Sequence, residues 1–288
     1  MLITRIAPFL LPALFFQSAV FAFISPLPLF VMMLKNNAGL TLLALLCNTA
    51  ILYALGTPTE ISVAVTLWMM VGILFPFLIK KTGRVQLSFG LSFVVFAGFI
   101  LSAFLMFTAK LGVHPIQYLK TEMGLGITQL AALQDSPVKK LVDEQGSDGL
   151  LRQLMTELPS GLLITLLLAF WVNLLFASQM VRGFLSPTFW ASFRNPEWLI
   201  WPTLAFASLF AFTEHAPYYV GLNGFKVVLV LYGFQGLSIV SHFLNRFKIL
   251  GLGRALIFSL AIFILMPLVI SLGFFDLWFD FRRKFGQN

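Results

Sequence analysis

One apolar segment, residues 219–242, carries several polar side chains. At about 100° per residue, most of them fall within an arc of roughly 120°, and the lysine lies just outside it. The arc contains Asn223, Gln235, Ser238, Ser241, His242 and, just beyond the segment, Asn245. Polar groups in hydrocarbon are costly unless they face a cavity or bond to other protein groups. The arc therefore predicts either the wall of a ligand-binding cavity or a set of hydrogen bonds between helices. The candidate ligand-binding residues are Asn223, Lys226, Gln235, Ser238 and His242.

Lys226 has three interpretations. Its ammonium group extends outward to the lipid headgroups, contacts a ligand, or pairs with an acidic group. Glu214 and His215, in the loop before this segment, are the nearest candidate partners. A Glu–His pair is also typical of metal or proton handling, but two groups alone do not make a metal site. Because His114 and the single cysteine, Cys47, lie elsewhere in the sequence, we expect no metal site and no cofactor.

The sequence motifs that mark common enzymes are missing. There is no GxxxxGK[ST] phosphate-binding loop, no HExxH metal motif and no GxSxG nucleophile elbow. No two carboxylates share an apolar segment, so a proton relay through buried acids is not indicated. We therefore expect a protein without enzymatic activity.

The composition defines the environment of these residues. Of the 288 residues, 59% are hydrophobic and only 10% are charged, and the mean hydropathy is +0.93. Soluble domains have about 25% charged residues, so this chain has too little charge to cover a globular surface. The net charge of +8 does not indicate nucleic acid, because the basic residues cluster at the ends of apolar runs. We expect an integral membrane protein whose main partner is the lipid bilayer.

Eight segments approach the length of about 20 apolar residues that a spanning helix needs. They predict an all-α, polytopic transmembrane helix bundle that forms a single integral membrane domain over residues 1–288. The short run 26–34 begins with Pro26 and Pro28, so it either extends the first span or forms a re-entrant turn. Pro267 predicts a kink in the last span. The predicted spans are 6–25, 39–55, 61–79, 87–109, 159–181, 198–213, 219–242 and 255–275.

The segment 110–158, between the fourth and fifth spans, is the most acidic part of the chain. Its apolar residues recur at spacings of three and four, which places them on one face of a helix. Two interpretations remain open for this extramembrane segment. It forms amphipathic helices on the membrane surface, or it packs over the mouth of the bundle as a cap.

Basic residues in short loops favour the cytoplasmic side of a membrane. Arg84, Arg194 and Lys248 follow the third, fifth and seventh spans, so eight single crossings place them inside and Asp143 outside. Both termini are then outside, which fits the basic tail 282–284 poorly. The alternative is a last segment that bends at Pro267 and does not cross. We prefer the model with eight crossings.

Several landmarks of the sequence resemble those of the YybS-like family of bacterial multi-pass membrane proteins, a DUF-type family of unknown function. The resemblance is clearest from about residue 158 to 285. It implies a bacterial inner (cytoplasmic) membrane location. The landmarks are Pro26, Pro28, Arg194, Pro196, Trp198, Gly236, Asp276, Asp280 and Arg282.

The family is distantly similar to the substrate-binding subunits of energy-coupling-factor vitamin transporters. That similarity implies a small-molecule cavity near the outer face and a separate ATPase partner. Two features depart from the pattern: those subunits have about six spans, and the Ala-xxx-Ala pair of their first helix is missing from the first span here.

The landmarks also have physical interpretations of their own. Arg194 is placed to bind a lipid phosphate or a partner's carboxylate. Asp276 and Asp280 share a helical face, and either is placed to form an ion pair with Arg282 or its neighbour. Gly236, on another side of its helix from the polar arc, allows a neighbouring helix to approach closely.

The sequence leaves two functions open. The first is a small-solute binding or transport subunit, which needs a cavity lined by the segment 219–242. The alternative is a non-catalytic membrane scaffold in envelope biogenesis, which needs polar residues that bond to one another. Either function implies a further membrane protein as partner, a coupling or an envelope component. A structure discriminates them by showing whether the polar arc faces an open cavity or a packed neighbour.

Overall fold

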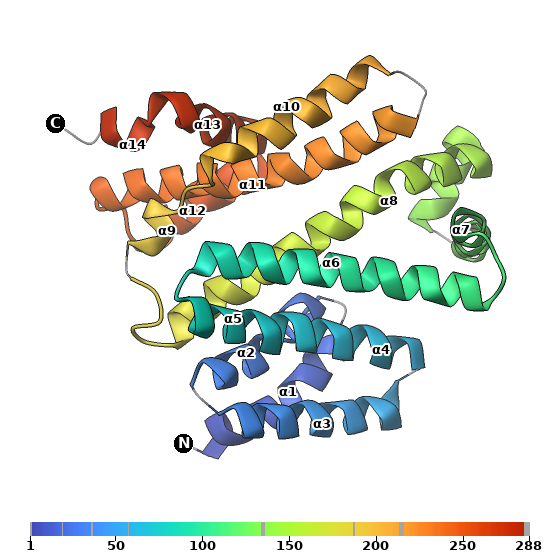
Figure 1. The fold of residues 1–288 in the computed structure, drawn as a ribbon, viewed down its shortest axis with the longest axis horizontal. Coiled ribbons are helices and arrows are strands. Elements are labelled where there is room, and N and C mark those ends of the chain that lie inside the picture. Colours follow the sequence, from blue (N-terminus) through green and yellow to red (C-terminus); the bar gives the residue numbers. More distant parts are fainter. Residues whose placement is uncertain are drawn as a thin grey trace. The chain divides into compact units, whose positions relative to one another are not determined.

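A computed structural model describes residues 2–18, 20–35, 37–56, 58–133, 136–186, 188–212 and 216–284. Its elements are all helical, as the sequence predicts (Figure 1). The chain divides into two compact units. The N-terminal unit comprises Met1–Leu125 and Thr165–Phe184, and the C-terminal unit comprises Gly126–Ile164 and Leu185–Asn288. Each unit is described by itself.

The N-terminal unit contains most of the first six helices and the end of a long one. Its elements are α1 (Leu2–Gln17), α2 (Leu27–Leu34), α3 (Ala38–Leu55), α4 (Pro58–Leu67), a π-helical stretch (Trp68–Leu74), α5 (Phe75–Thr82) and α6 (Val85–Lys110). Two helices are divided between the units. α7 (Pro115–Ala131) begins in the N-terminal unit and ends in the C-terminal unit, and α8 (Pro137–Met180) begins in the C-terminal unit and ends in the N-terminal unit.

A single asparagine of α3 forms hydrogen bonds with backbone groups of α1 beside its prolines. Pro12 has no N–H to give to the carbonyl of Pro8, and the Asn48 side-chain amide of α3 donates to that carbonyl at 2.9 Å. The Asn48 carbonyl accepts from the N–H of Ala13, also at 2.9 Å. Asn48 is completely buried, so a proline kink in one helix is satisfied by a polar side chain of its neighbour.

The short run 26–34 turns back into the protein. α1 runs parallel to α3, because the side chain of Gln17 lies beside Gly56 while Asn48 contacts the middle of α1. α2 then returns: Trp68 donates to Ser25 near its start, and Lys80 donates to the Met33 carbonyl near its end. Residues 26–34 therefore do not extend the first span, and α1 begins at the end of the unit where α2 finishes.

The C-terminal unit is built around α11. After α8 come α9 (Phe189–Ser192), a 3-10 turn (Glu197–Leu199), α10 (Ile200–Ser208), a second 3-10 turn (Leu209–Ala211), α11 (Ala216–Arg246), α12 (Gly251–Phe263), α13 (Met266–Phe279) and α14 (Phe281–Lys284). α10 packs along α11, where Thr203 bonds to Tyr232 at 3.1 Å and Phe206 fills the space beside Gly224.

The last apolar segment does not cross as a straight helix. α12 and α13 meet at a bend of 90°, next to Pro267, as the sequence predicts. Arg254 near the start of α12 donates to Ser241 at 2.9 Å, and Arg282 after α13 donates to Ser238 at 3.1 Å. The pair therefore begins and ends at the same end of α11. The preferred prediction, a last single crossing that puts the tail opposite the basic loop, is not confirmed.

The predicted count of eight spans is not confirmed. Five helical stretches are long and apolar enough to cross a membrane, or six if the bent pair counts as one span: Ala38–Leu55, Glu60–Thr82, Val85–Lys110, Pro137–Met180, Ala216–Arg246 and the pair Gly251–Phe263 with Met266–Phe279. The predicted first and sixth spans contain the shorter helical stretches Ile6–Gln17 and Glu197–Ala211. The predicted fifth span, 159–181, coincides with the second half of α8, which is helical through Pro159 and has its non-helical residue at Gly146.

The predicted amphipathic segment 110–158 is helical, in α7 and the first part of α8. Some of its apolar residues are buried, such as Ile127 and Leu150, and others are exposed, such as Ile116 and Leu130. Exposed apolar side chains on these helices fit the interpretation of a surface helix. Residues 134 and 135 of this segment lie outside the described residues.

Candidate functional site

The five candidate ligand-binding residues have different neighbours in the structure. Asn223 and Lys226 contact α8, Gln235 and Ser238 belong to a polar cluster with α13, and His242 lines a pocket near the end of α11. Asn223 and Gln235 are about 18 Å apart along the helix axis at 1.5 Å per residue. The polar arc of the segment 219–242 therefore contains three groups of residues with different partners.

Asn223 bonds to the backbone of α8 beside Pro159. Its carbonyl accepts from the N–H of Ser160 at 2.8 Å, and its amide donates to the carbonyl of Thr156 at 3.0 Å. These two backbone groups are partners in an uninterrupted helix, so the asparagine amide is inserted between them. Asn48 likewise bonds to one N–H and one carbonyl beside Pro12 in the N-terminal unit, those of Ala13 and Pro8. Asn223 thus joins two helices and is not free for a ligand.

Lys226 pairs with an acid of α8. Its ammonium lies 2.5 Å from the carboxylate of Glu157, and the two side chains are 31% and 48% exposed. Of the three interpretations, the ion pair is correct, with a partner that the sequence did not single out. Glu214 and His215, the partners it proposed, lie outside the described residues. At this exposure the pair contributes about 0.2–1 kcal/mol.

A buried carboxylate organises the end of α13. Asp276 is 1% exposed, and its oxygens accept from the Gln235 amide at 3.0 Å, the Arg282 guanidinium at 2.7 Å and the N–H of Phe281 at 2.9 Å. The predicted ion pair between Asp276 and Arg282 is confirmed. Burial in this low-dielectric interior makes each of these bonds stronger than in water and costly to break. We call Gln235, Asp276 and Arg282 the carboxylate cluster.

The carboxylate cluster fixes the extended segment between α9 and α10. Gln235 accepts from the N–H of Asn195 at 2.9 Å, and Ser238 and Arg282 donate to the carbonyl of Phe193 at 2.8 Å and 2.9 Å. Pro196 ends the segment with extended backbone angles before the 3-10 turn. Backbone groups that have no helical partner here are satisfied by side chains.

Gly236 permits the contact that holds this cluster together. A Cβ atom on Gly236 would lie 1.9 Å from the Val269 carbonyl oxygen, and one on Gly273 would lie 1.9 Å from the Tyr232 oxygen. Only glycine lets the backbones of α11 and α13 approach so closely. The predicted close approach at Gly236 is confirmed, and Gly273 is its counterpart on α13.

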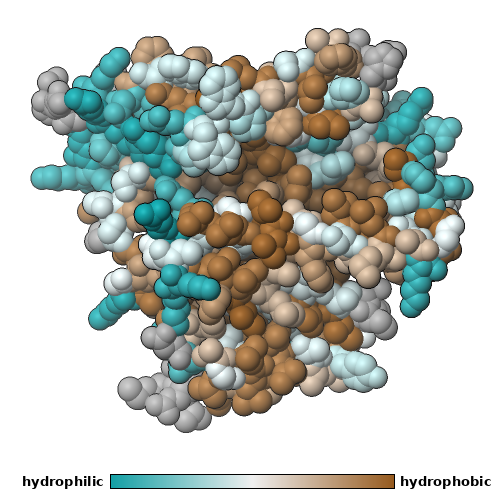
Figure 2. Space-filling view, in the orientation of Figure 1, coloured by the Kyte–Doolittle hydropathy of each residue, from teal (hydrophilic) through white to brown (hydrophobic). Residues whose placement is uncertain are grey.

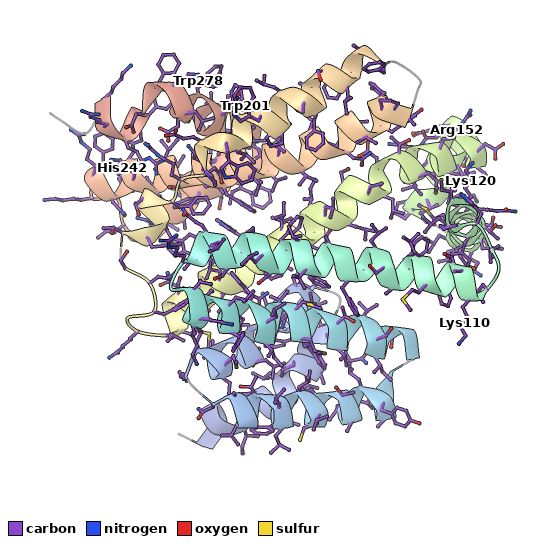
Figure 3. All side chains as sticks on the ribbon, viewed as in Figure 1. Lys110, Lys120, Arg152, Trp201, His242 and Trp278 are labelled. Carbon is purple, nitrogen blue, oxygen red and sulfur yellow. The ribbon has the colours of Figure 1, made fainter. Side chains whose placement is uncertain are left out.

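A basic pocket opens near the C-terminal end of α11. Its volume is about 910 Å³. His242 lies at this end of α11 in Figure 3, and hydrophilic side chains gather over α9, α14 and the end of α11 in Figure 2. Four guanidinium groups and one carboxylate line it. The lining residues are Thr188, Ala191, Ser192, Arg194, His242, Asn245, Arg246, Asp280, Arg282 and Arg283.

The arginines of the basic pocket are positioned in different ways. Arg282 is buried to 9% exposure and committed to Asp276. Arg194 pairs with Asp280, and both side chains are partly exposed, at 42% and 37%. The predicted contact of Arg194 with a lipid phosphate or a partner's carboxylate stays a prediction. Asp280 adopts a left-handed backbone conformation, φ 42°, as it ends α13.

Sequence reasoning missed most of this pocket. It used the basic residues after spans five and seven, among them Arg194 and Arg246, to orient the chain. It did not place them together with Arg283. Their distance from one another in the sequence hides the pocket.

Comparison with protein families decides the affiliation of the chain. The profile of the family described as "Predicted membrane protein (DUF2232)" matches residues 2–277. The chain belongs to this family. Comparison with curated proteins and with solved structures gives no match. This DUF2232 protein is thus a multi-pass membrane protein by family and by its long apolar helices.

The remaining landmarks of the DUF2232 chain have structural positions. Pro26 precedes α2 and Pro28 lies in its first turn, where a missing N–H costs nothing. Trp198 is 63% exposed, as are Trp201 and Trp278 to similar degrees (Figure 3). Such rings anchor a protein at the membrane interface. Among the described residues, no three His, Cys, Asp or Glu side chains are grouped closely enough to hold a metal ion.

Proposed function

We propose that this DUF2232 protein is a non-catalytic membrane subunit that binds a small anionic solute in the basic pocket. The observation that carries the proposal is the gathering of four arginines and His242 around one pocket of about 910 Å³. Ligand pockets for small molecules are usually about 300–1,000 Å³. Guanidinium groups bind carboxylates and phosphates through pairs of parallel hydrogen bonds.

The carboxylate cluster supports this proposal by holding the pocket in shape. Arg282 ties the end of α13 to the carbonyls of α9 and of the segment that follows it, while Gln235 ties the same segment to α11. Binding to a preformed site avoids the cost of ordering its walls. The residues that the sequence proposed as ligands, Gln235 and Ser238, therefore act as supports behind the pocket.

The proposal retains the resemblance to YybS-like proteins and, more distantly, to solute-binding subunits of energy-coupling-factor transporters. A subunit of that kind works in a bacterial inner membrane with a separate coupling protein. One feature differs from the resemblance. The basic pocket is at the end of α11 where Arg246, Lys248 and Arg254 gather, which is the cytoplasmic side by the charge of the loops.

We propose a topology in which both termini are cytoplasmic. α1 begins at the end of its unit where α2 returns to Lys35, and the tail after α13 lies beside Arg246. All basic loops are then on one side, and the acidic segment 110–158 is on the other, as an extramembrane segment between α6 and the spanning part of α8. This arrangement removes the conflict between the basic tail and the loops.

Cysteine labelling tests this topology. In a Cys47→Ser background, a membrane-impermeant maleimide added to intact cells should label Asp143→Cys. It should reach Lys248→Cys and Arg283→Cys only after the membrane is permeabilised. Labelling of Arg283→Cys but not of Lys248→Cys in intact cells would restore a last crossing and contradict the proposal.

A stability screen tests the binding function. Protein purified in a neutral detergent is heated with single anionic, neutral and cationic solutes. The anionic ones should raise the unfolding temperature, since a ligand at about 100 times its Kd stabilises the folded state by about 2.7 kcal/mol. Arg246→Gln should weaken this rise, whereas Lys248→Gln, a charge loss outside the pocket lining, should not. An equal response to neutral solutes would contradict an anion site.

A scaffold in envelope biogenesis is the second candidate. It is favoured by the hydrogen bonds of Asn223, Gln235 and Ser238, which are made to other parts of the chain. Such bonds typically contribute about 0.6 kcal/mol each between membrane helices. If no solute of any charge changes the stability of the purified protein, the scaffold replaces the binding subunit.

A further inference from the structure

We propose that the basic pocket recognises a phosphate group, which rests on the proposed function and narrows it to one class of anion. The pocket places Arg194, Arg246 and Arg283 around His242, with hydroxyl groups from Thr188 and Ser192 on the α9 side. Arginine forks and hydroxyl donors are the groups that bind the several oxygens of a phosphate.

The charges in the pocket favour a phosphate over a single carboxylate. Four guanidinium groups face one carboxylate in the lining, that of Asp280. Asp276 is buried behind the lining, where it balances Arg282. The other three arginines and Asp280 leave a charge of +2, of which a carboxylate ligand would balance half, whereas a phosphate monoester carries about −1.5 to −2 at pH 7.

The groups of the pocket have separate tasks. Arg282 is 9% exposed and donates to Asp276, Phe193 and Ala191, so it positions the wall. Arg283 is exposed on the short α14 and Arg246 is partly exposed at the end of α11, so both can turn to an anion. Arg194 forms an ion pair with Asp280, so a bound phosphate competes with the Asp280 carboxylate for the Arg194 guanidinium.

The phosphate has two possible sources, a lipid headgroup and a soluble phosphate ester. The pocket lies at the end of α11, which is the headgroup level of a spanning helix. Trp278 and Phe279, two and one residues before Asp280, are 58% and 46% exposed, as expected of side chains that touch lipid. A headgroup enters from this side and a soluble ester enters from the cytoplasm.

Matched pairs of probes separate the chemistry from its source. Glycerol 3-phosphate is compared with glycerate, which has a carboxylate in place of the phosphate ester. Short-chain phosphatidic acid is compared with phosphatidylcholine of the same chain length. Binding is measured on the full chain in neutral detergent by the shift of its unfolding temperature and by native mass spectrometry, in wild type, Arg246→Gln/Arg283→Gln and Lys248→Gln.

We expect a phosphate probe to bind at least about tenfold more tightly than its matched partner, and the double variant to lose at least about tenfold in affinity, as for hydrogen bonds to charged groups. Lys248→Gln should bind like wild type and so controls for loss of surface charge. Binding of phosphatidic acid alone assigns a lipid source, and binding of glycerol 3-phosphate assigns a soluble one; both support the inference.

Equal binding of glycerate and glycerol 3-phosphate overturns the phosphate inference but leaves the anion-binding function intact. Binding of no anion overturns both. Binding that the double variant retains in full moves the site elsewhere on the protein and also overturns the inference. Unfolding temperatures of both variants without any probe show that they are folded, so loss of binding is not mistaken for loss of structure.

Discussion

Asp276→Ala is expected to lower the free energy of unfolding by about 3–5 kcal/mol, the usual cost of removing one partner of a buried ion pair. The carboxylate of Asp276 is fully buried and Arg282 is nearly so. The substitution leaves the Arg282 charge without its partner and also removes the acceptor of the Gln235 amide and the Phe281 N–H. Unfolding in detergent, followed by helical signal against added denaturant, measures the change.

Two further variants show whether the lost charge partner is the cause. Asp280→Ala removes a carboxylate of the same chain segment whose pair with Arg194 is partly exposed, so it should cost less than about 1 kcal/mol. The double variant Asp276→Ala/Arg282→Met removes both buried charges and should regain part of the stability. A loss as large for Asp280→Ala as for Asp276→Ala would contradict the buried cluster as the stabilising element.

Gly236→Ala is the second substitution with a large expected effect. The new methyl group would lie 1.9 Å from the Val269 carbonyl oxygen and 2.7 Å from its carbon. Both atoms are backbone, so α13 must move away from α11 and the bonds from Gln235 to Asp276 must lengthen. We expect a loss of roughly 3 kcal/mol, the upper part of the range for overpacking, measured by the same unfolding experiment.

Gly233→Ala provides the matched control for this prediction. It lies one turn earlier on α11, and its added methyl group would meet Ile270 and Met266 at 3.5 and 3.6 Å, which is ordinary contact. Because alanine favours a helix over glycine by about 1 kcal/mol, this variant should be as stable as wild type or more so. Similar losses for both variants would mean that α13 does not pack on α11 through Gly236.

The packing at Gly236 and the charges at Asp276 have the same consequence for the pocket. Both fix the end of α13, and the residues that follow it, Asp280, Arg282 and Arg283, line the basic pocket. A protein that loses either contact should also lose anion binding, although Gly236 and Asp276 are absent from the pocket lining. Stability and binding are therefore coupled through one helix end.

The sequence by itself determined the class of the protein and much of its local structure. Composition and apolar runs are local properties. They therefore predicted a helical membrane protein, helices long and apolar enough to cross a membrane, and the bend at Pro267. The pattern of the glycines predicted the close approach at Gly236. The sequence also predicted an ion pair between Asp276 or Asp280 and an arginine of the tail, and the pair of Asp276 with Arg282 confirms it.

Only the tertiary structure decided which groups meet. Lys226 pairs with Glu157, and Asn223 bonds to the backbone of α8. Both contacts depend on which helices are neighbours. The return of α2 and α13 depends on contacts far apart in sequence, because an apolar run has the same composition whether it crosses or turns back. For the same reason the basic pocket is hidden in the sequence: its arginines come from the α9–α10 segment, α11 and α14, and folding alone brings them to one place.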